Sequence, residues 1–413
     1  MLKRLRVKNF KSINEEIELS FEPSKDIDSI YLTEDNNLKM AIIYGQNASG
    51  KTNIIKAIEF IRGLIFEPLD SRDKKIPIVP FKFKDNIDDI SEFEIDFIED
   101  GYEFKYFISL NKNSIKKETL LFKELYSRRF SKVFERYENS IKWGTKIKLS
   151  KVEKDFLKLN TLENNLLLSA YSKVKVDIEY LDIVKNFFRR ILPPIYPKMD
   201  LLGFTLEKIY KNEVNRSDIV YILKNADFAI DDFFIEESEI DLAIDGAFID
   251  FLKQIDKIDI DIKSSFKKIE VFFTHFNKYR LKLEEESSGT QRFYQLAVFL
   301  SILYKNSYIL PIDELESSLH PDLLKFFISI FLANSKDSQI LITTHNRELL
   351  LEDDLFVEDM VWFCEKRVDG STDLFNILDF GDEIKDKSQI YNLYKYGKIG
   401  AIPNIKNYLG IFE

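Results

Sequence analysis

The sequence predicts an α/β protein with a mixed β-sheet core, and three apolar stretches carry this prediction. The first is Ala41–Tyr44, a short strand that runs into the pattern Gly-x-x-x-x-Gly-Lys-Thr at 45–52 and then into a helix. The other two, at 308–312 and 339–344, are strands that end in an acidic pair and in a histidine. Strands that alternate with helices in this way are typical of α/β folds.

The N-terminal part of the chain adds strands of a different kind. Leu2–Phe10 alternates apolar and basic residues, which predicts a strand with one solvent-facing side, and a second strand is expected at 16–21. The segments 93–97 and 102–108 alternate in the same way around Asp100-Gly101. An Asp-Gly pair between two alternating segments favours a β-hairpin.

The glycine-rich loop has the composition that binding of a triphosphate requires. Its glycines let successive backbone N–H groups point inward at an anion, and the following helix, expected to start near Asn53, adds the positive end of its dipole. Lys51 would reach the β- and γ-phosphates, and the Thr52 hydroxyl would bind Mg²⁺. The residues expected to bind ATP are therefore Gly45, Gln46, Asn47, Ala48, Ser49, Gly50, Lys51, Thr52 and Asn53.

Acidic and histidine side chains follow the two later strands. Asp313-Glu314 follows 308–312 directly, and His345 follows the next strand, one helix later. Carboxylates at the C-terminal end of a buried strand suit a Mg²⁺ ion and a base that activates water. We therefore expect the pair Asp313-Glu314 to serve a metal and a water-activating base, and His345 to have a functional role. Pro311 is unusual here, because it removes a backbone N–H from a strand that is expected to be central.

Composition bounds the class of protein. The chain has 413 residues, enough for two or three domains, and its 45% hydrophobic content is ample for a packed core. Its single cysteine, Cys364, excludes an internal disulfide and fits a reducing compartment. No run of about 18 apolar residues and no signal-peptide pattern occurs, so we expect a cytoplasmic protein without a membrane span. The net charge of −10 argues against indiscriminate binding to nucleic acid.

Two segments differ sharply in charge. Residues 112–151 carry twelve Lys or Arg and four Asp or Glu, whereas residues 226–263 carry twelve acidic residues and three lysines. The basic segment alternates, so it is either the solvated face of a sheet edge or a contact for nucleic acid or an acidic partner. The acidic segment has apolar residues at mixed spacing, which favours a helical or irregular surface.

The interval 112–264 behaves as an insertion into a larger unit, which comprises 1–111 and 265–413. Amphipathic helices are expected inside the insertion at 180–192 and 216–226. The larger unit resumes with two paired strands and then a Ser-Ser-Gly turn that opens a helix. Such a turn offers backbone N–H groups to an anion, but many helices begin this way, so alone it indicates little.

Five stretches together resemble the head of ABC-type ATPases, in the group of the RecF, SMC and overcoming-lysogenization proteins. These stretches are Lys8–Ser12, Gly45–Asn53, Ser287–Gln291, Asp313-Glu314 with Leu319–Pro321, and Thr344–Asn346. Within this group, the tail Tyr394–Pro403 resembles the RloA or AbiL branch, to which the PARIS protein AriA is similar and which is tied to bacterial anti-phage defence. The resemblance covers both ends of the chain and covers the insertion weakly.

The resemblance implies an ABC/SMC-head-like P-loop ATPase fold with a mixed β-sheet core and an α+β insertion. It also implies that two subunits sandwich ATP, with Ser288, Gly289 and Gln291 of one subunit capping the ATP that the other holds. By the same resemblance, Asp313 would hold Mg²⁺ and Glu314 would orient or deprotonate the attacking water. His345 would sense the γ-phosphate and have a catalytic role.

Departures from the family pattern imply a slow enzyme. Thr290 stands where a second signature glycine is usual, which would loosen the cap on the γ-phosphate of the partner. No glutamine occurs between Gln46 and Gln254, so the glutamine that usually senses Mg²⁺ is missing. The intact Asp313-Glu314 pair nevertheless disfavours a nucleotide-binding scaffold without turnover.

The resemblance implies a switch ATPase of an abortive-infection system that controls a separately encoded effector. Residues 346–413 are too few for the Toprim nuclease domain that some family members append, so a Toprim-like nuclease is the expected partner, with a phage protein as trigger. The alternative is a RecF- or SMC-like ATPase that binds DNA in repair, with 112–151 as the contact for nucleic acid. The insertion is too short for the long coiled coil of SMC proteins.

Overall fold

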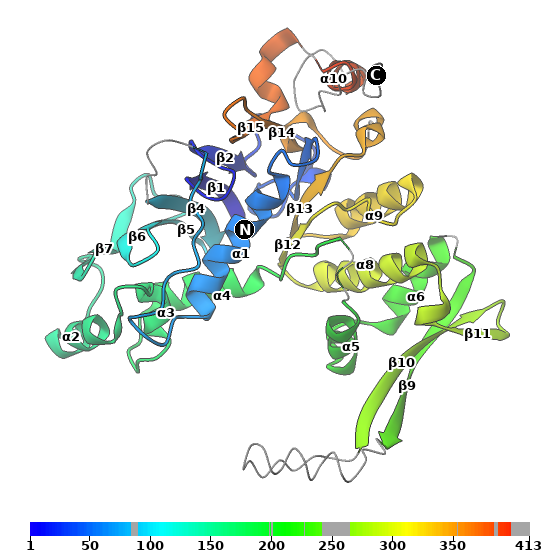
Figure 1. The fold of residues 1–413 in the computed structure, drawn as a ribbon, viewed down its shortest axis with the longest axis horizontal. Helices are drawn as coiled ribbons and strands as arrows, with labels where there is room; N and C mark the ends of the chain where they lie inside the picture. The colour runs from blue at the N-terminus through cyan, green and yellow to red at the C-terminus, as the bar shows by residue number, and fades with distance from the viewer. Residues whose placement is uncertain are drawn as a thin grey trace, which may run out of the picture. The chain divides into compact units, whose positions relative to one another are not determined.

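A computed structural model of the chain gives the fold (Figure 1). The structure describes residues 1–83, 90–197, 199, 201–226, 228–241, 265–352, 354–383 and 387–397. The chain splits into two compact units, Met1–Asp200 with Leu303–Glu413, and Leu201–Ile302.

The first unit contains a seven-stranded antiparallel sheet. Its strand order is β2 (Ile17–Ser20), β1 (Leu2–Lys8), β4 (Ser91–Glu99), β5 (Tyr102–Leu110), β6 (Ile115–Glu124), β7 (Ser131–Tyr137) and β8 (Ser140–Trp143). The predicted hairpin is confirmed, because β4 pairs with β5 and the turn between them has φ angles of 49° at Asp100 and 79° at Gly101. Two successive residues with positive φ form the turn whose twist matches that of the paired strands.

The basic stretch 112–151 forms the strands β6 to β8 at one side of this sheet, with β8 at the edge. Several of its lysines are paired with carboxylates. Lys123 Nζ lies 2.9 Å from Glu103 Oε2, and Lys116 Nζ lies 3.3 Å from Glu138 Oε1. These pairs support the interpretation of the stretch as the solvated face of a sheet edge.

Helix α4 (Glu179–Arg190) packs on the same sheet and matches the amphipathic helix expected at 180–192. The ring of Phe187 stacks on that of Phe97 in β4 with centroids 3.9 Å apart, and Phe188 packs edge-on against Phe97 at 5.9 Å. Aromatic packing therefore fixes the helix on the sheet. The segment before α4 forms two further helices, α2 (Lys151–Asn160) and α3 (Leu167–Tyr171).

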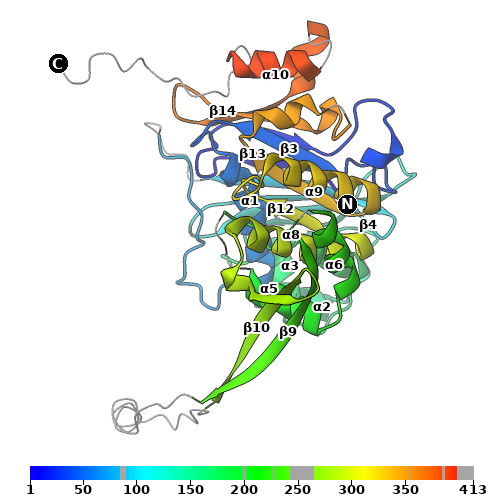
Figure 2. The ribbon, with the colours of Figure 1, turned by 90° about the vertical axis from the view of Figure 1, so that its right-hand side faces the viewer.

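A second sheet in the first unit carries the glycine-rich loop. Its strand order is β12 (Ile309–Ile312), β13 (Gln339–Thr344), β3 (Met40–Gly45), β14 (Val361–Lys366) and β15 (Thr372–Asn376). The first four strands run parallel, and β15 is antiparallel to β14. β3 lies beside β13 near the centre of the sheet (Figure 2) and is buried along its whole length. The loop therefore leaves the sheet from a central strand, as in other α/β folds with strands covered on both faces.

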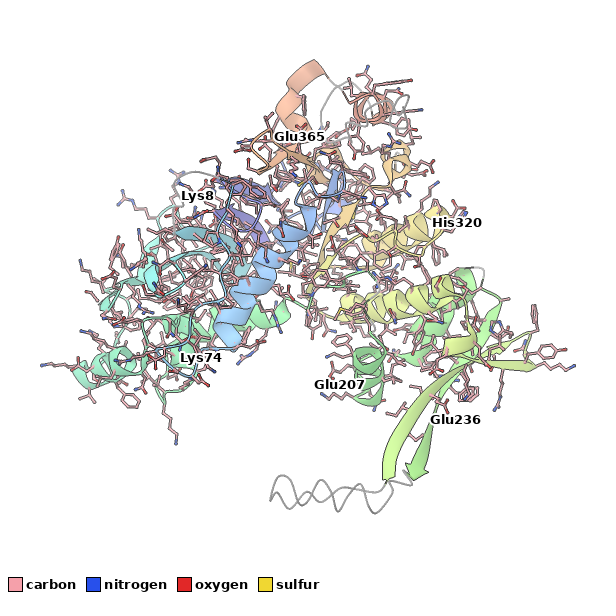
Figure 3. All side chains as sticks on the ribbon, viewed as in Figure 1. Lys8, Lys74, Glu207, Glu236, His320 and Glu365 are labelled. Atoms are coloured by element: carbon pink, nitrogen blue, oxygen red, sulfur yellow. The ribbon has the colours of Figure 1, made fainter. Side chains whose placement is uncertain are left out.

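Helices follow the strands of this sheet. α1 (Lys51–Phe66) begins at the lysine of the loop, two residues before the predicted start. α9 (Pro321–Asn334) connects β12 to β13, and His320, labelled in Figure 3, caps it by accepting a hydrogen bond from Asp322 N at 3.3 Å. α10 (Lys387–Lys395) follows the last strand. Short 3-10 helices lie at Ser29–Tyr31, Leu283–Glu285, Arg347–Leu351, Glu358–Met360 and Ile377–Glu383.

Pro311 lies on an edge strand, so the prediction that its strand is central is wrong. The Pro311 carbonyl oxygen accepts a hydrogen bond from Ile195 N at 3.0 Å, on the side away from β13. Because the N–H and C=O of one strand residue point to the same side, the missing N–H also lies on that outer side. Proline in a sheet is confined to such edge positions.

The second unit combines helices with a three-stranded antiparallel sheet. Its helices are α5 (Leu202–Tyr210), α6 (Arg216–Asn225) and α8 (Ser288–Lys305), and its sheet has the order β11 (Tyr279–Lys282), β10 (Ser265–His275), β9 (Ile230–Asp241). The predicted helix at 216–226 and the predicted paired strands after residue 267 are confirmed. Phe204 of α5 stacks on Phe299 of α8 with ring centroids 5.0 Å apart.

Part of the acidic stretch 226–263 contradicts the prediction of a helical or irregular surface. Residues 230–241 form β9, which pairs with β10. The strand forms because its apolar residues make cross-strand pairs, such as Phe234 stacked on Phe272 with centroids 5.3 Å apart. Residues 242–264 lie outside the described part of the chain. Throughout that described part, no helix combines the length and apolarity that crossing a bilayer requires.

Candidate nucleotide-binding site

The loop between β3 and α1 requires glycine at two positions. A Cβ atom on Gly45 would lie 2.4 Å from the backbone oxygen of Cys364 in β14. A Cβ atom on Gly50 would lie 1.9 Å from Thr372 Oγ1 in β15, and the φ of Gly50 is 111°, which side chains rarely adopt. The hairpin β14–β15 therefore lies directly against the loop, and only glycine lets the two approach so closely.

A cavity of about 330 Å³ opens at this loop. Residues 47–53 line it, together with Ser12 and Glu314. The structure therefore brings the loop predicted to bind phosphate next to the carboxylate predicted to activate water.

Lys51 folds back onto the loop. Its ammonium nitrogen donates hydrogen bonds to the carbonyl oxygens of Gly45 at 2.7 Å and of Gln46 at 3.0 Å. Burial lowers the pKa of Lys51 from its usual range, because desolvation disfavours the charged form. An anion at the loop would compensate this cost, since it offers the ammonium stronger acceptors than carbonyl oxygens.

Thr52 and Asp313 are brought together, as the sequence predicts. Thr52 Oγ1 donates to Asp313 Oδ2 at 2.9 Å, and Thr343 Oγ1 donates to Asp313 Oδ1 at 2.6 Å. A hydroxyl and a carboxylate side by side are hard oxygen donors, which suit Mg²⁺ because that ion uses few protein ligands and keeps waters and phosphate oxygens. The two residues therefore fit a magnesium ion. In the described ranges no group of three or more His, Cys, Asp or Glu could hold another metal.

Glu314 lies in an uncommon backbone conformation beside this pair. Its φ is 47°, in the left-handed region that few residues other than glycine adopt. The Glu314 N–H donates to Thr343 Oγ1 at 2.9 Å, so the neighbouring strand holds the turn. This turn places the half-buried Glu314 carboxylate at the wall of the loop cavity.

His345 contacts Glu316, a residue that the sequence reasoning missed. Glu316 Oε1 lies 2.7 Å from His345 Nδ1, and it also accepts the His345 backbone N–H at 2.7 Å. The carboxylate fixes the imidazole with Nδ1 as the donor, so Nε2 is the ring atom left for a ligand. The sequence does mark Glu316 as a candidate, because it is the third acidic residue within 313–316, directly after the strand.

Hydroxyl groups from the two ends of the chain support the loop. Ser12 Oγ accepts a hydrogen bond from Asn53 Nδ2 at 2.7 Å and contacts Thr372 Oγ1 at 2.7 Å. Thr372 Oγ1 in turn donates to the Ser49 carbonyl oxygen at 2.8 Å. The side chain of Asn53 therefore braces the loop. Thr372 lies in no recognisable motif, so nothing in the sequence marks it.

Ser288, Gly289 and Gln291 lie in the second unit, at the N-terminal end of α8. Ser287 Oγ accepts a hydrogen bond from Thr290 N at 3.1 Å, which caps the helix. The side-chain amide of Gln291 donates to a backbone carbonyl of the same turn at 2.9 Å. Ser288 is exposed, so its hydroxyl is open to contact by another molecule.

A strand, a glycine-rich loop and a helix, with a Thr–Asp pair and a carboxylate at the loop, define the class of P-loop nucleotide-binding domains. The predicted fold class, α/β with a mixed sheet core, is confirmed. Residues 40–352 match the family described as "AAA domain, putative AbiEii toxin, Type IV TA system". This match spans most of the chain, which therefore belongs to that family of AAA domains, a family of P-loop ATPases.

Solved structures that are similar to this chain include heads of SMC proteins. The SMC head domain from Thermotoga maritima shares 16% identity at a TM-score of 0.42, over 91% of this chain and 98% of that one. An SMC head bound to the C-terminal winged-helix domain of ScpA shares 16% sequence identity with this chain at a TM-score of 0.46. The match covers 92% of this chain and 98% of that one. The Smc head domain derived from Pyrococcus furiosus, with an extended coiled coil, shares 14% sequence identity at a TM-score of 0.44. The match covers 96% of this chain and 99% of that one. No curated protein sequence matches the chain.

Proposed function

We propose that this protein binds ATP with Mg²⁺ at the P-loop, hydrolyses it slowly, and uses the ATP state as a switch in an anti-phage system. The observation that carries the proposal is the convergence of Thr52, Asp313 and Glu314 at the loop cavity. Such a set serves the transfer of a phosphoryl group to water, because positioning and charge stabilisation are the main catalytic terms in that reaction.

The places of the side chains support the following roles. Lys51 would exchange its two carbonyl partners for oxygens of the β- and γ-phosphates. Thr52 and Asp313 would hold a Mg²⁺ ion, which would supply positive charge against the phosphates. Glu314 accepts the proton of a water that attacks the γ-phosphate. His345, held by Glu316, donates a hydrogen bond to the γ-phosphate as charge develops there.

We further propose that two copies of the chain share two ATP sites. The exposed Ser288 and the neighbouring Gly289 offer backbone N–H groups at the start of α8, and these would cap the γ-phosphate bound to the P-loop of the other copy. Each copy then supplies a P-loop to one site and a cap to the other, which gives a two-fold dimer.

Ser288→Arg tests this arrangement. The bulky cation at the cap should abolish ATP hydrolysis and leave binding of ATP unchanged, as measured by phosphate release and by titration calorimetry. Mixing the Ser288→Arg and Lys51→Ala chains should restore activity, because each heterodimer contains one site with an intact P-loop and an intact cap. If no mixing ratio restores activity, each site is complete within one chain and the dimer proposal fails.

The proposed role in defence rests on the family match and on the C-terminal tail. The description of the family includes the AbiEii toxin, and the tail resembles the RloA or AbiL branch. The chain would control a separately encoded effector, a Toprim-like nuclease, after a phage protein triggers it. The basic stretch 112–151 and the acidic stretch 226–263 are the candidate docking faces for this effector.

Expression of the chain alone and together with its genomic neighbour tests the effector. We expect nucleic-acid cleavage and growth arrest only when the neighbour is present. A Glu314→Gln chain expressed with the neighbour serves as the matched control for the role of hydrolysis. Cleavage by the purified chain alone, with ATP and Mg²⁺, would contradict a separate effector.

A DNA-binding ATPase of the RecF or SMC type is the second candidate function. The exposed lysines and arginines among residues 112–151 favour it. Phosphate contacts make DNA binding fall steeply as the salt concentration rises. Stimulation of ATP hydrolysis by DNA, together with such a salt dependence, would therefore favour repair over a defence switch.

A further inference from the structure

A second cavity lies along α1 and is distinct from the cavity at the loop. Its volume is about 760 Å³, which is the size of a site for a small molecule, and it shares no lining residue with the loop cavity. Much of its lining is apolar and includes Phe60 and Leu64 of α1 and the segment Leu192, Pro193 and Pro194.

Three half-buried cations line this cavity: Lys11, Lys56 and Arg62. Across the described residues, none of the three has a carboxylate within ion-pair distance. Arg62 Nε is buried and has no hydrogen-bond partner there. Lys11 lies over the Phe10 ring and Arg62 over the Phe66 ring, each 5.5 Å from the ring centroid, so two of the cations have aromatic contacts. An anion in the cavity would add the counter-charge that these contacts do not supply.

The charges around the three cations strengthen that conclusion. Burial and the nearby Lys56 ammonium lower the pKa of Lys11, whereas the Glu59 carboxylate raises it. The two lysines therefore repel each other, and the net direction is a lowered pKa. Two carboxylates also line the cavity, Glu59 and Glu67, and both are exposed. Glu59 Oε2 accepts a hydrogen bond from the Tyr196 hydroxyl at 2.6 Å and so is directed to the tyrosine.

Gly63 keeps one wall of the cavity open. It lies inside α1, where glycine destabilises a helix relative to alanine. No close packing accounts for it, because an added Cβ atom would meet no atom within 4 Å. Gly63 lines the cavity, so a larger side chain at this position would occupy space that a ligand could use.

We propose that this cavity binds a small phosphorylated ligand of nucleotide size. Its phosphate would lie among Lys11, Lys56 and Arg62, and its flat apolar part against Phe60 and Pro193. A phosphate dianion suits the site better than a carboxylate, because its greater charge and larger number of terminal oxygens let it serve more than one cation and relieve the repulsion between the two lysines. The site is separate from the ATP site proposed above and does not depend on it.

Titration calorimetry of the Lys51→Ala chain with AMP and with inorganic phosphate tests the proposal, because that variant disables the P-loop. We expect one AMP per chain. The Lys56→Glu/Arg62→Glu substitutions, added to Lys51→Ala, should weaken binding of AMP by roughly tenfold to a hundredfold, the effect of losing charge-assisted hydrogen bonds. Lys224→Glu/Lys336→Glu, the same charge change at two exposed lysines outside every proposed binding surface, should leave it unchanged.

Gly63→Trp is the second variant, and it fills the cavity without changing any charge. It should abolish binding of AMP at an unchanged melting temperature, which separates a blocked site from an unfolded protein. Failure of the Lys51→Ala chain to bind AMP would overturn the proposal. So would equal loss of ATP and AMP binding in Lys56→Glu/Arg62→Glu with Lys51 intact, because the cavity would then be the outer end of the ATP site. A Lys51→Ala chain that binds ATP normally would refute the P-loop assignment alone.

Discussion

Replacement of Glu314 by Gln is expected to slow ATP hydrolysis by about two to four orders of magnitude while ATP remains bound. The amide keeps the shape of the side chain but cannot accept a proton, and a general base contributes on the order of 10²–10⁴ in rate. The ATP-bound dimer should therefore accumulate. Single-turnover hydrolysis and light scattering on the same sample measure both effects.

His345→Ala and Glu316→Gln serve as comparisons for Glu314→Gln. Both should lower the rate less, because they would alter the hydrogen bond that His345 is proposed to give to the γ-phosphate and leave the proposed base in place. The two variants should resemble each other, since Glu316 acts through the imidazole. A Glu314→Gln chain that hydrolyses ATP at the normal rate would mean that the base lies elsewhere.

Lys51→Ala is expected to weaken ATP binding by about two orders of magnitude or more. The substitution removes the cation that is proposed to contact the β- and γ-phosphates, and hydrogen bonds to charged groups are worth roughly 1.5–3 kcal/mol each. The fold should persist, because among the described residues the hydrogen-bond partners of the Lys51 ammonium are carbonyl oxygens of its own loop. Titration with a fluorescent ATP analogue measures the change.

Lys51→Met provides the matched control for this prediction. It keeps most of the length of the buried side chain and removes only the charge, so it should bind ATP as poorly as Lys51→Ala. The melting temperatures of both variants should stay close to that of the unmodified chain in the absence of nucleotide. Nucleotide affinity at the unmodified level in either variant would refute the role of Lys51.

The features that the sequence predicted well are local. Gly45 and Gly50 lie where the loop demands glycine, and the Asp100-Gly101 turn has the two positive φ angles that its hairpin requires. In each case neighbouring residues determine the backbone conformation. The strand followed by Asp313 was predictable for the same reason, since a short apolar run and its end are visible without knowledge of the fold.

The features that were missed depend on distant parts of the chain. The edge position of β12 follows from the order of strands in the sheet, which no local pattern reports. Thr372 reaches the loop only because β15 pairs with β14. In β9 the apolar residues do not alternate, because Phe233, Phe234 and Ile235 are consecutive and acidic pairs flank them. The strand at 230–241 depends on its pairing with β10, which no local pattern reports. Charge describes the solvated face of a strand and says little about whether the strand exists.

The close approach of Gly50 and Thr372 has consequences for which substitutions this protein can accept and for which fragments of it keep an intact loop. A side chain at position 50 would collide with the Thr372 hydroxyl, so the two positions should vary together among relatives. Ser12 and Thr372 both lie outside the matched span 40–352. A fragment trimmed to that span would keep every residue of the phosphate-binding motif and lose the hydroxyl groups on which the loop rests.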